Sequence, residues 1–136
     1  MSHDLFWMRR AIEIAGNSGE DCPVGCVIVH NGCEISSSCN MVERRDDPIA
    51  HSEILCIRSA CKSLGSRYLS GCTLYCTLEP CQMCDYAIKL ARIDKVIFGS
   101  FRNDGSIFKN EVVGGVLENE CTKMMSDFFK NVRRAK

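Results

Sequence analysis

Apolar and polar residues alternate along this chain with two different periods. Near the N-terminus, apolar positions from Leu5 to Ala15 recur every three or four residues, which predicts an amphipathic helix over residues 4–16. An apolar run follows at 24–29, and the dipeptide Asn31-Gly32 leads from it into a second run at 34–38. Because Asn-Gly is strongly favoured in hairpin turns, we expect two antiparallel strands here.

The rest of the chain continues to alternate between helical and strand patterns. An apolar stripe that begins near Ile54 and stops before Gly65 predicts a second helix. Further segments predict strands at 72–77, 95–99 and 111–116 and a third helix from Pro80 to about Leu90. A terminal helix is predicted at 118–134, and its inward-facing residues are expected to be Met124, Met125, Phe128 and Phe129. This order implies a three-layer α/β/α sandwich with a mixed, roughly five-stranded sheet, formed by one domain over residues 1–136.

Composition narrows the possible functions without choosing one. The 17 basic and 17 acidic residues give a net charge of zero, which is not the basic footprint of an avid nucleic-acid binder. The chain has no apolar stretch long enough to cross a membrane and no secretory signal, so we expect a cytoplasmic protein. Most of the 11 cysteines lie in apolar runs, where a free thiol behaves as a small hydrophobic residue.

Two short motifs depart from this pattern and suggest chemistry. One is His-Ser-Glu at 51–53, and the other is Pro-Cys-Gln-Met-Cys at 80–84. One imidazole and two thiolates can hold zinc by three ligands and leave its fourth position for water, as catalytic zinc sites do. We therefore predict one Zn²⁺ per chain, with His51, Cys81 and Cys84 as its ligands and Glu53 as the catalytic proton carrier.

Other interpretations of the same residues remain open. Cys81 and Cys84 would also be consistent with a structural site that recruits a fourth ligand, although the chain has no second C-x-x-C motif, or with inert core thiols. Glu79 is the competing carboxylate, and we predict that it caps or orients the start of the third helix. The chain lacks a Gly-x-Ser-x-Gly elbow and a Walker-type loop.

At these motifs the chain resembles the cytidine deaminase superfamily, and within it the bacterial tRNA adenosine deaminases. The matching segments are 22–29, 47–54, 73–84, 91–99, 115–121 and 126–129. The resemblance implies a cytidine deaminase-like fold, a homodimer and conversion of the wobble adenosine in a tRNA anticodon loop to inosine. It also implies that Asn40 contacts the base and that Val24 packs against it. A turn asparagine and a core valine are the alternatives for these two residues.

Three departures from the family pattern bear on the substrate. Ser52 stands where alanine is usual, and Asp85-Tyr86 replaces a small pair. The stretch from Phe101 to Val113 is shorter than the counterpart that helps tRNA adenosine deaminases grip the anticodon loop. The motifs and the resemblance together predict hydrolytic deamination of the tRNA wobble adenosine, and the alternative is deamination of a free nucleobase or nucleoside such as cytosine or guanine. A non-catalytic zinc-binding or RNA-binding module is the third possibility, but it would have no use for Glu53.

Overall fold

Helices and strands follow one another along the chain in an alternating order. The computed structural model describes residues 2–102 and 111–135. Within these residues the elements are α1 (Ser2–Ala15), β1 (Gly25–His30), β2 (Cys33–Cys39), α2 (Val42–Arg45), α3 (Ser52–Leu64), β3 (Cys72–Leu78), α4 (Gln82–Leu90), β4 (Lys95–Ser100), β5 (Glu111–Val113) and α5 (Glu118–Ala135). Every predicted helix and strand is present, and α2 is an additional one.

The strands form one mixed sheet in the order β2-β1-β3-β4-β5. Strand β1 is antiparallel to both β2 and β3, whereas β3, β4 and β5 run parallel. The β1–β2 hairpin turns at Asn31 and Gly32, which both have positive φ, as their sequence predicted. In the register of β1 against β3, Cys26 lies directly opposite Cys76. This register brings two thiols together beside the candidate site.

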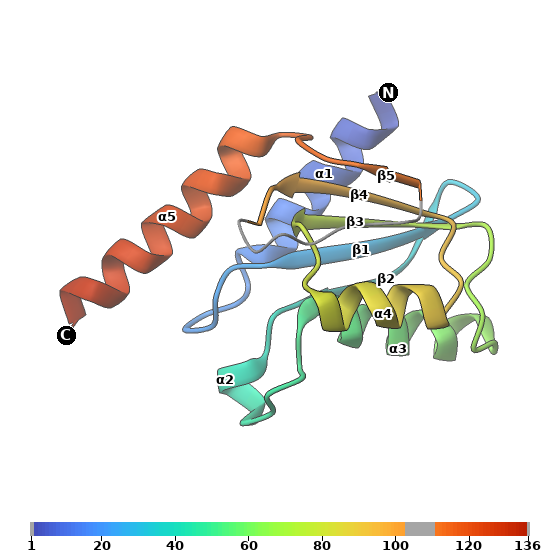
Figure 1. Ribbon diagram of the computed structural model, residues 1–136, viewed down its shortest axis with the longest axis horizontal. Helices are drawn as coiled ribbons and strands as arrows, with labels where there is room; N and C mark the ends of the chain where they lie inside the picture. The colour runs from blue at the N-terminus through green and yellow to red at the C-terminus, as the bar shows by residue number, and fades with distance from the viewer. Residues whose placement is uncertain (1, 103–110, 136) are drawn as a thin grey trace.

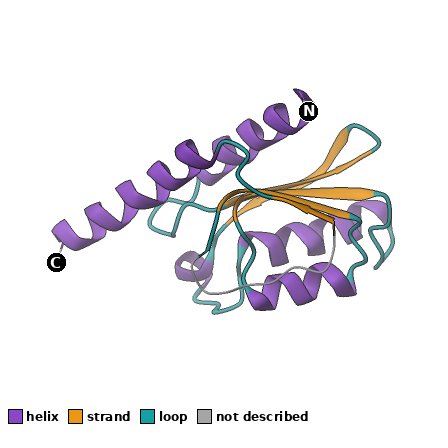
Figure 2. Cartoon of the chain, turned by 45° about the horizontal axis from the view of Figure 1, so that its top comes forward, coloured by secondary structure: helices purple, strands orange, loops and turns teal. Residues whose placement is uncertain are grey.

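Helices cover both faces of this sheet. Helices α1 and α5 lie on one face, and α3 and α4 lie on the other (Figure 1). Figure 2 shows the sheet between these two helix layers. The C-terminal half of α5 extends beyond the sheet (Figure 1). The predicted three-layer α/β/α sandwich is confirmed.

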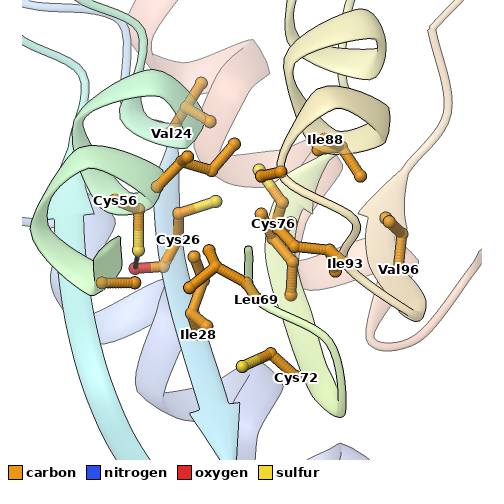
Figure 3. Close-up of a cluster of buried hydrophobic side chains, with 14 residues drawn as sticks. Val24, Cys26, Ile28, Cys56, Leu69, Cys72, Cys76, Ile88, Ile93 and Val96 are labelled. Atoms are coloured by element: carbon orange, nitrogen blue, oxygen red, sulfur yellow. Dashed lines mark hydrogen bonds between the residues drawn. The ribbon is translucent and has the colours of Figure 1, made fainter. Parts of the chain in front are cut away.

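Each helix layer encloses its own apolar core. The core on the side of α3 and α4 includes Cys26, Ile28, Leu74, Cys76, Ile88 and Val96 (Figure 3). The core on the side of α1 and α5 includes Met8, Ala11, Val27, Tyr75, Ile97 and Cys121. Consecutive strand residues alternate between the two cores because side chains of a strand point to opposite faces.

Several details differ from the sequence prediction. Strand β5 ends at Val113 rather than at residue 116, because the chain turns at Gly115 with a φ of 85°. Pro80 precedes α4 instead of lying in its first turn, since Cys81 is the N-cap. Phe129 is 47% exposed, so the prediction that it faces inward was wrong.

Two further expectations concern the shortened stretch at 101–113 and membrane-spanning segments. Residues 103–110, which belong to the stretch predicted to be shortened, lie outside the described residues. Among residues 2–102 and 111–135, no helix combines the length and the apolar character needed to cross a bilayer.

Candidate active site

Two of the three predicted zinc ligands occupy the position immediately before a helix. His51 is the N-cap of α3, and Cys81 is the N-cap of α4. Both side chains lie at the N-terminal ends of their helices, where they can bind a shared ligand. Cys84 lies in the first turn of α4. The positive ends of two helix dipoles favour thiolates at this place.

The three side chains converge on one point. Nδ1 of His51 lies 3.6 Å from Sγ of Cys81 and 3.5 Å from Sγ of Cys84. In a tetrahedral site, Zn–N bonds of about 2.05 Å and Zn–S bonds of about 2.3 Å separate nitrogen from sulfur by about 3.6 Å. The donor set therefore fits one zinc ion. Within the described ranges, no fourth His, Cys, Asp or Glu joins this group, which argues against the structural four-ligand alternative.

The two thiols of this group differ in acidity. A hydrogen bond from the Cys84 thiol, together with the nearby His51, lowers the pKa of Cys81 to about 4. The same hydrogen bond and burial raise the pKa of Cys84. Zinc binding needs both sulfurs as thiolates, so the proton of Cys84 must leave when the ion binds.

Glu53 lies in a second, fully buried group. Its carboxylate and the Sγ atoms of Cys26 and Cys76 lie within 4.8 Å of one another. Burial raises the pKa of both thiols, which therefore remain neutral, so this group suits the wall of a carboxylate pocket better than a second metal site. The Ser52 hydroxyl donates a hydrogen bond to Oε1 of Glu53 at 2.6 Å.

The sequence analysis treated Cys26 and Cys76 only as core residues. Both are core residues, but they also border the Glu53 carboxylate. The contact depends on the β1–β3 register, in which Cys26 and Cys76 are direct partners. Figure 3 shows them on neighbouring strands. No local signal could have found this contact, because both strands are buried on both faces and only their pairing brings the two cysteines together.

The predicted base-contacting residues lie close to each other at the ends of β1 and β2. The backbone N–H of Asn40 donates to the carbonyl of Val24 at 3.0 Å, and Met41 N–H donates to the carbonyl of Ala50 at 3.0 Å. The second bond ties this segment to the residue before His51. Asn40 lines a cavity of about 390 Å³, whereas Val24 is buried in the core below α3 and α4. Their roles toward a substrate stay predictions.

Three further residues that the sequence analysis considered have local roles. The N-cap of α4 is Cys81 rather than Glu79, so the capping part of that prediction was wrong. Oε1 of Glu79 accepts a hydrogen bond from the backbone N–H of Arg102 at 2.9 Å, which fixes the end of β4. Asp85 pairs with Lys89 one turn along α4 at 2.8 Å, and Tyr86 is exposed.

Comparison with known proteins gives consistent matches. A family model described as the cytidine and deoxycytidylate deaminase zinc-binding region matches residues 1–100. The tRNA-specific adenosine deaminase of Bacillus subtilis (strain 168) is 41% identical over 152 residues, which cover 100% of this chain and 94% of the relative.

Two solved structures extend the comparison to the fold. A structure from a study of A-to-I editing by tRNA:A34 deaminases at the wobble position superposes with a TM-score of 0.82 and 34% identity, covering 88% of this chain and 98% of that one. The guanine deaminase from Bacillus subtilis gives a TM-score of 0.69 and 40% identity, covering 73% of this chain and 65% of that one.

These matches confirm the resemblance, the cytidine deaminase-like fold and the deaminase chemistry that the motifs predicted. The family model covers both the His-Ser-Glu and the Pro-Cys-Gln-Met-Cys segments, which are the segments that form the two groups described above. The chain belongs to the cytidine and deoxycytidylate deaminase family and carries the family's zinc-binding region.

Proposed function

We propose that this chain, as one domain over residues 1–136, deaminates the wobble adenosine of a tRNA anticodon loop to inosine. The observation that carries the proposal is the 41% identity to a tRNA-specific adenosine deaminase over the whole chain. A similarity of this extent includes the surroundings of the site as well as its motifs. The full-length match therefore favours the same substrate class.

In this proposal His51, Cys81 and Cys84 hold one zinc ion. The N-to-S distances of 3.5 and 3.6 Å support this assignment, because they are those of a tetrahedral site before the ion is added. When bound, zinc makes a water molecule a strong nucleophile at neutral pH. Three protein donors, one fewer than a closed structural site has, would suit a catalytic ion.

Glu53 is the proton carrier of the reaction. Its carboxylate accepts a proton from the attacking water while a C–O bond forms at C6 of adenine. Glu53 delivers that proton to the ring nitrogen N1, takes the second proton from the hydroxyl group now on C6 and passes it to the amino group. The C–N bond breaks, ammonia leaves and the base becomes hypoxanthine. Burial of Glu53 supports this role, since a carboxylate screened from bulk water transfers protons to the substrate rather than to solvent.

A Glu53→Gln variant tests the assigned role. We expect kcat to fall by about 10²–10⁴-fold, because an amide of the same shape cannot carry the proton. Zinc content, measured by atomic absorption, should stay at one per chain. A variant that keeps both its zinc and its kcat would contradict the role of Glu53.

A specific observation favours a second candidate, deamination of a free purine base. The guanine deaminase from Bacillus subtilis is 40% identical over 73% of this chain. The shortened stretch at 101–113 would remove part of the grip on an anticodon loop. Both candidates use the same zinc and the same glutamate, so the chemistry does not separate them.

A side-by-side assay separates the two substrates. The purified protein is incubated with a tRNA anticodon stem-loop carrying a wobble adenosine and, separately, with guanine, cytosine and their nucleosides. Inosine in the stem-loop, detected by nucleoside mass spectrometry, supports the first candidate. Ammonia release from a free base without any inosine would replace it by the second.

We also propose that the protein is a cytoplasmic homodimer paired through the faces of α3 and α4. An apolar groove of about 350 Å³ runs between these helices, lined by Ile54, Ile57, Arg58, Arg67, Ala87, Leu90 and Ala91. Leu90 and Tyr86 are each 65% exposed on α4. A second copy would cover this apolar surface. The cytoplasmic location is supported by the 11 cysteines, which are all free thiols.

A further inference from the structure

Ser52 is buried against the proposed proton carrier. It is the first residue of α3 and has an exposed fraction of 0%. Its hydroxyl donates to Oε1 of Glu53 over 2.6 Å, and Glu53 itself is only 3% exposed. A hydrogen bond of this length from a hydroxyl to a carboxylate is a strong, charge-assisted one.

The arrangement is not one that helix geometry produces by itself. Consecutive residues of a helix do not normally face each other, so this bond fixes both side chains in particular rotamers. Within residues 2–102 and 111–135, the Glu53 carboxylate accepts its hydrogen bond from the Ser52 hydroxyl. The neighbours of the carboxylate include the thiols of Cys26 and Cys76. A thiol is a weak donor, so these neighbours cannot replace the hydroxyl.

We propose that Ser52 is a positioning residue for Glu53, whose hydroxyl holds Oε1 and leaves Oε2 to exchange protons with water and substrate. The proposal rests on the role of Glu53 proposed above. A single anchored oxygen prevents the carboxylate from rotating among orientations in the pocket. The second oxygen then stays in one place through the successive proton transfers.

This role predicts an effect on the chemical step rather than on substrate binding. Glu53 without its anchor would still be present and buried, but it would occupy the productive orientation for less of the time. Substrate contacts would be unchanged, since Ser52 is fully buried. The expected signature is therefore a lower kcat at constant KM.

The test compares four proteins with zinc bound: the wild type, Ser52→Ala, Ser52→Thr and Ser36→Ala. Ser36 is the matched control, because its buried hydroxyl donates to the backbone carbonyl of Cys56 in α3 at 2.9 Å. The substrate is the wobble-adenosine stem-loop, or the free base if the wild type prefers it. Zinc content and thermal unfolding are measured on the same samples.

We expect Ser52→Ala to lower kcat about tenfold with KM within about twofold of the wild type. Ser52→Thr, which keeps the hydroxyl, should restore most of this loss, and Ser36→Ala should leave kcat unchanged. A Ser52→Ala variant with wild-type kcat, or with a raised KM instead, would overturn the proposal. Glu53→Gln, run alongside, separates the two hypotheses: if it is inactive while Ser52→Ala is fully active, only the role of Ser52 fails.

Discussion

At the scale of single residues, identical side chains have different roles because of where they lie. Cys84 and Cys121 are both fully buried cysteines. Cys84 shares its environment with the His51 imidazole at 3.5 Å, whereas Cys121 packs beside Gly99 of β4. A thiol becomes a metal ligand only where other donors converge on the same point.

This difference gives a prediction for the zinc site. Cys84→Ala should bind zinc too weakly to retain it during purification and should lose deaminase activity, because two ligands remain where three are needed. Metal content by atomic absorption is the measurement. Cys121→Ala is the control, and it should keep one zinc per chain while losing some stability through the cavity that it creates. Equal zinc content in the two variants would refute the assignment of Cys84.

At the scale of helices and strands, the sequence correctly predicted the elements that are determined by residues close together in the chain. The periodicity of α1 and the Asn31-Gly32 turn are local signals, and both were interpreted correctly. Helix α2 was missed because its four residues are too few to show a period. Interactions from far along the chain hold it: the carboxylate of Asp21 accepts hydrogen bonds from the backbone N–H groups of Glu43 at 2.7 Å and Arg44 at 3.2 Å, and the Arg44 guanidinium donates to the carbonyl of Asn17.

The residues of the candidate site also differ in whether the sequence could predict them. The zinc ligands follow from short motifs, which a sequence displays directly. The contact of Cys26 and Cys76 with Glu53 depends on the pairing of two strands about fifty residues apart, and the pairing of Glu79 with Arg102 depends on the approach of β3 and β4. Such contacts cannot be inferred from one segment alone, because the topology decides them.

A substitution of Asp21 tests whether its hydrogen bonds stabilise α2. Asp21→Ala should lower the free energy of unfolding by about 2 kcal/mol, since two backbone donors of α2 would lose their buried acceptor. Denaturant unfolding followed by circular dichroism measures the change. The adjacent, exposed Glu20 gives the control variant Glu20→Ala, which should remain within about 0.5 kcal/mol of the wild type. Similar losses in both variants would mean that α2 does not depend on Asp21.

Contact between elements can be tested at Gly25, where β1 meets α1. A Cβ at this position would collide with the carbonyl oxygen of Ala11, and neither backbone can move without disturbing the core between them. Gly25→Ala should therefore cost about 3 kcal/mol of stability. Gly65→Ala is the control: Gly65 has a φ of 65° and open space around it, so only about 1 kcal/mol of backbone strain is expected. Equal costs would show that the close approach of α1 is unimportant.

At the scale of the whole molecule, both helix layers leave apolar side chains exposed, among them Phe6 on α1 and Phe129 on α5. The layer of α3 and α4 carries the apolar groove, and Leu90 and Tyr86 extend from it into solvent. His51 and Cys81 are the N-caps of these same two helices. A partner copy bound to this layer would therefore stabilise α3 and α4, the helices next to the proposed zinc ligands.

Leu90→Arg tests the proposed dimer. In a symmetric pairing the new guanidinium would enter an apolar contact already flanked by Arg58 and Arg67, and burying it there without a partner is unfavourable. We expect sedimentation at micromolar concentration to change from the mass of two chains to that of one. Leu5→Arg, on the exposed side of α1, is the control and should leave the dimer intact. A wild-type protein that sediments as a single chain would rule out this dimer, whereas a dimeric Leu90→Arg variant would assign the contact to another face.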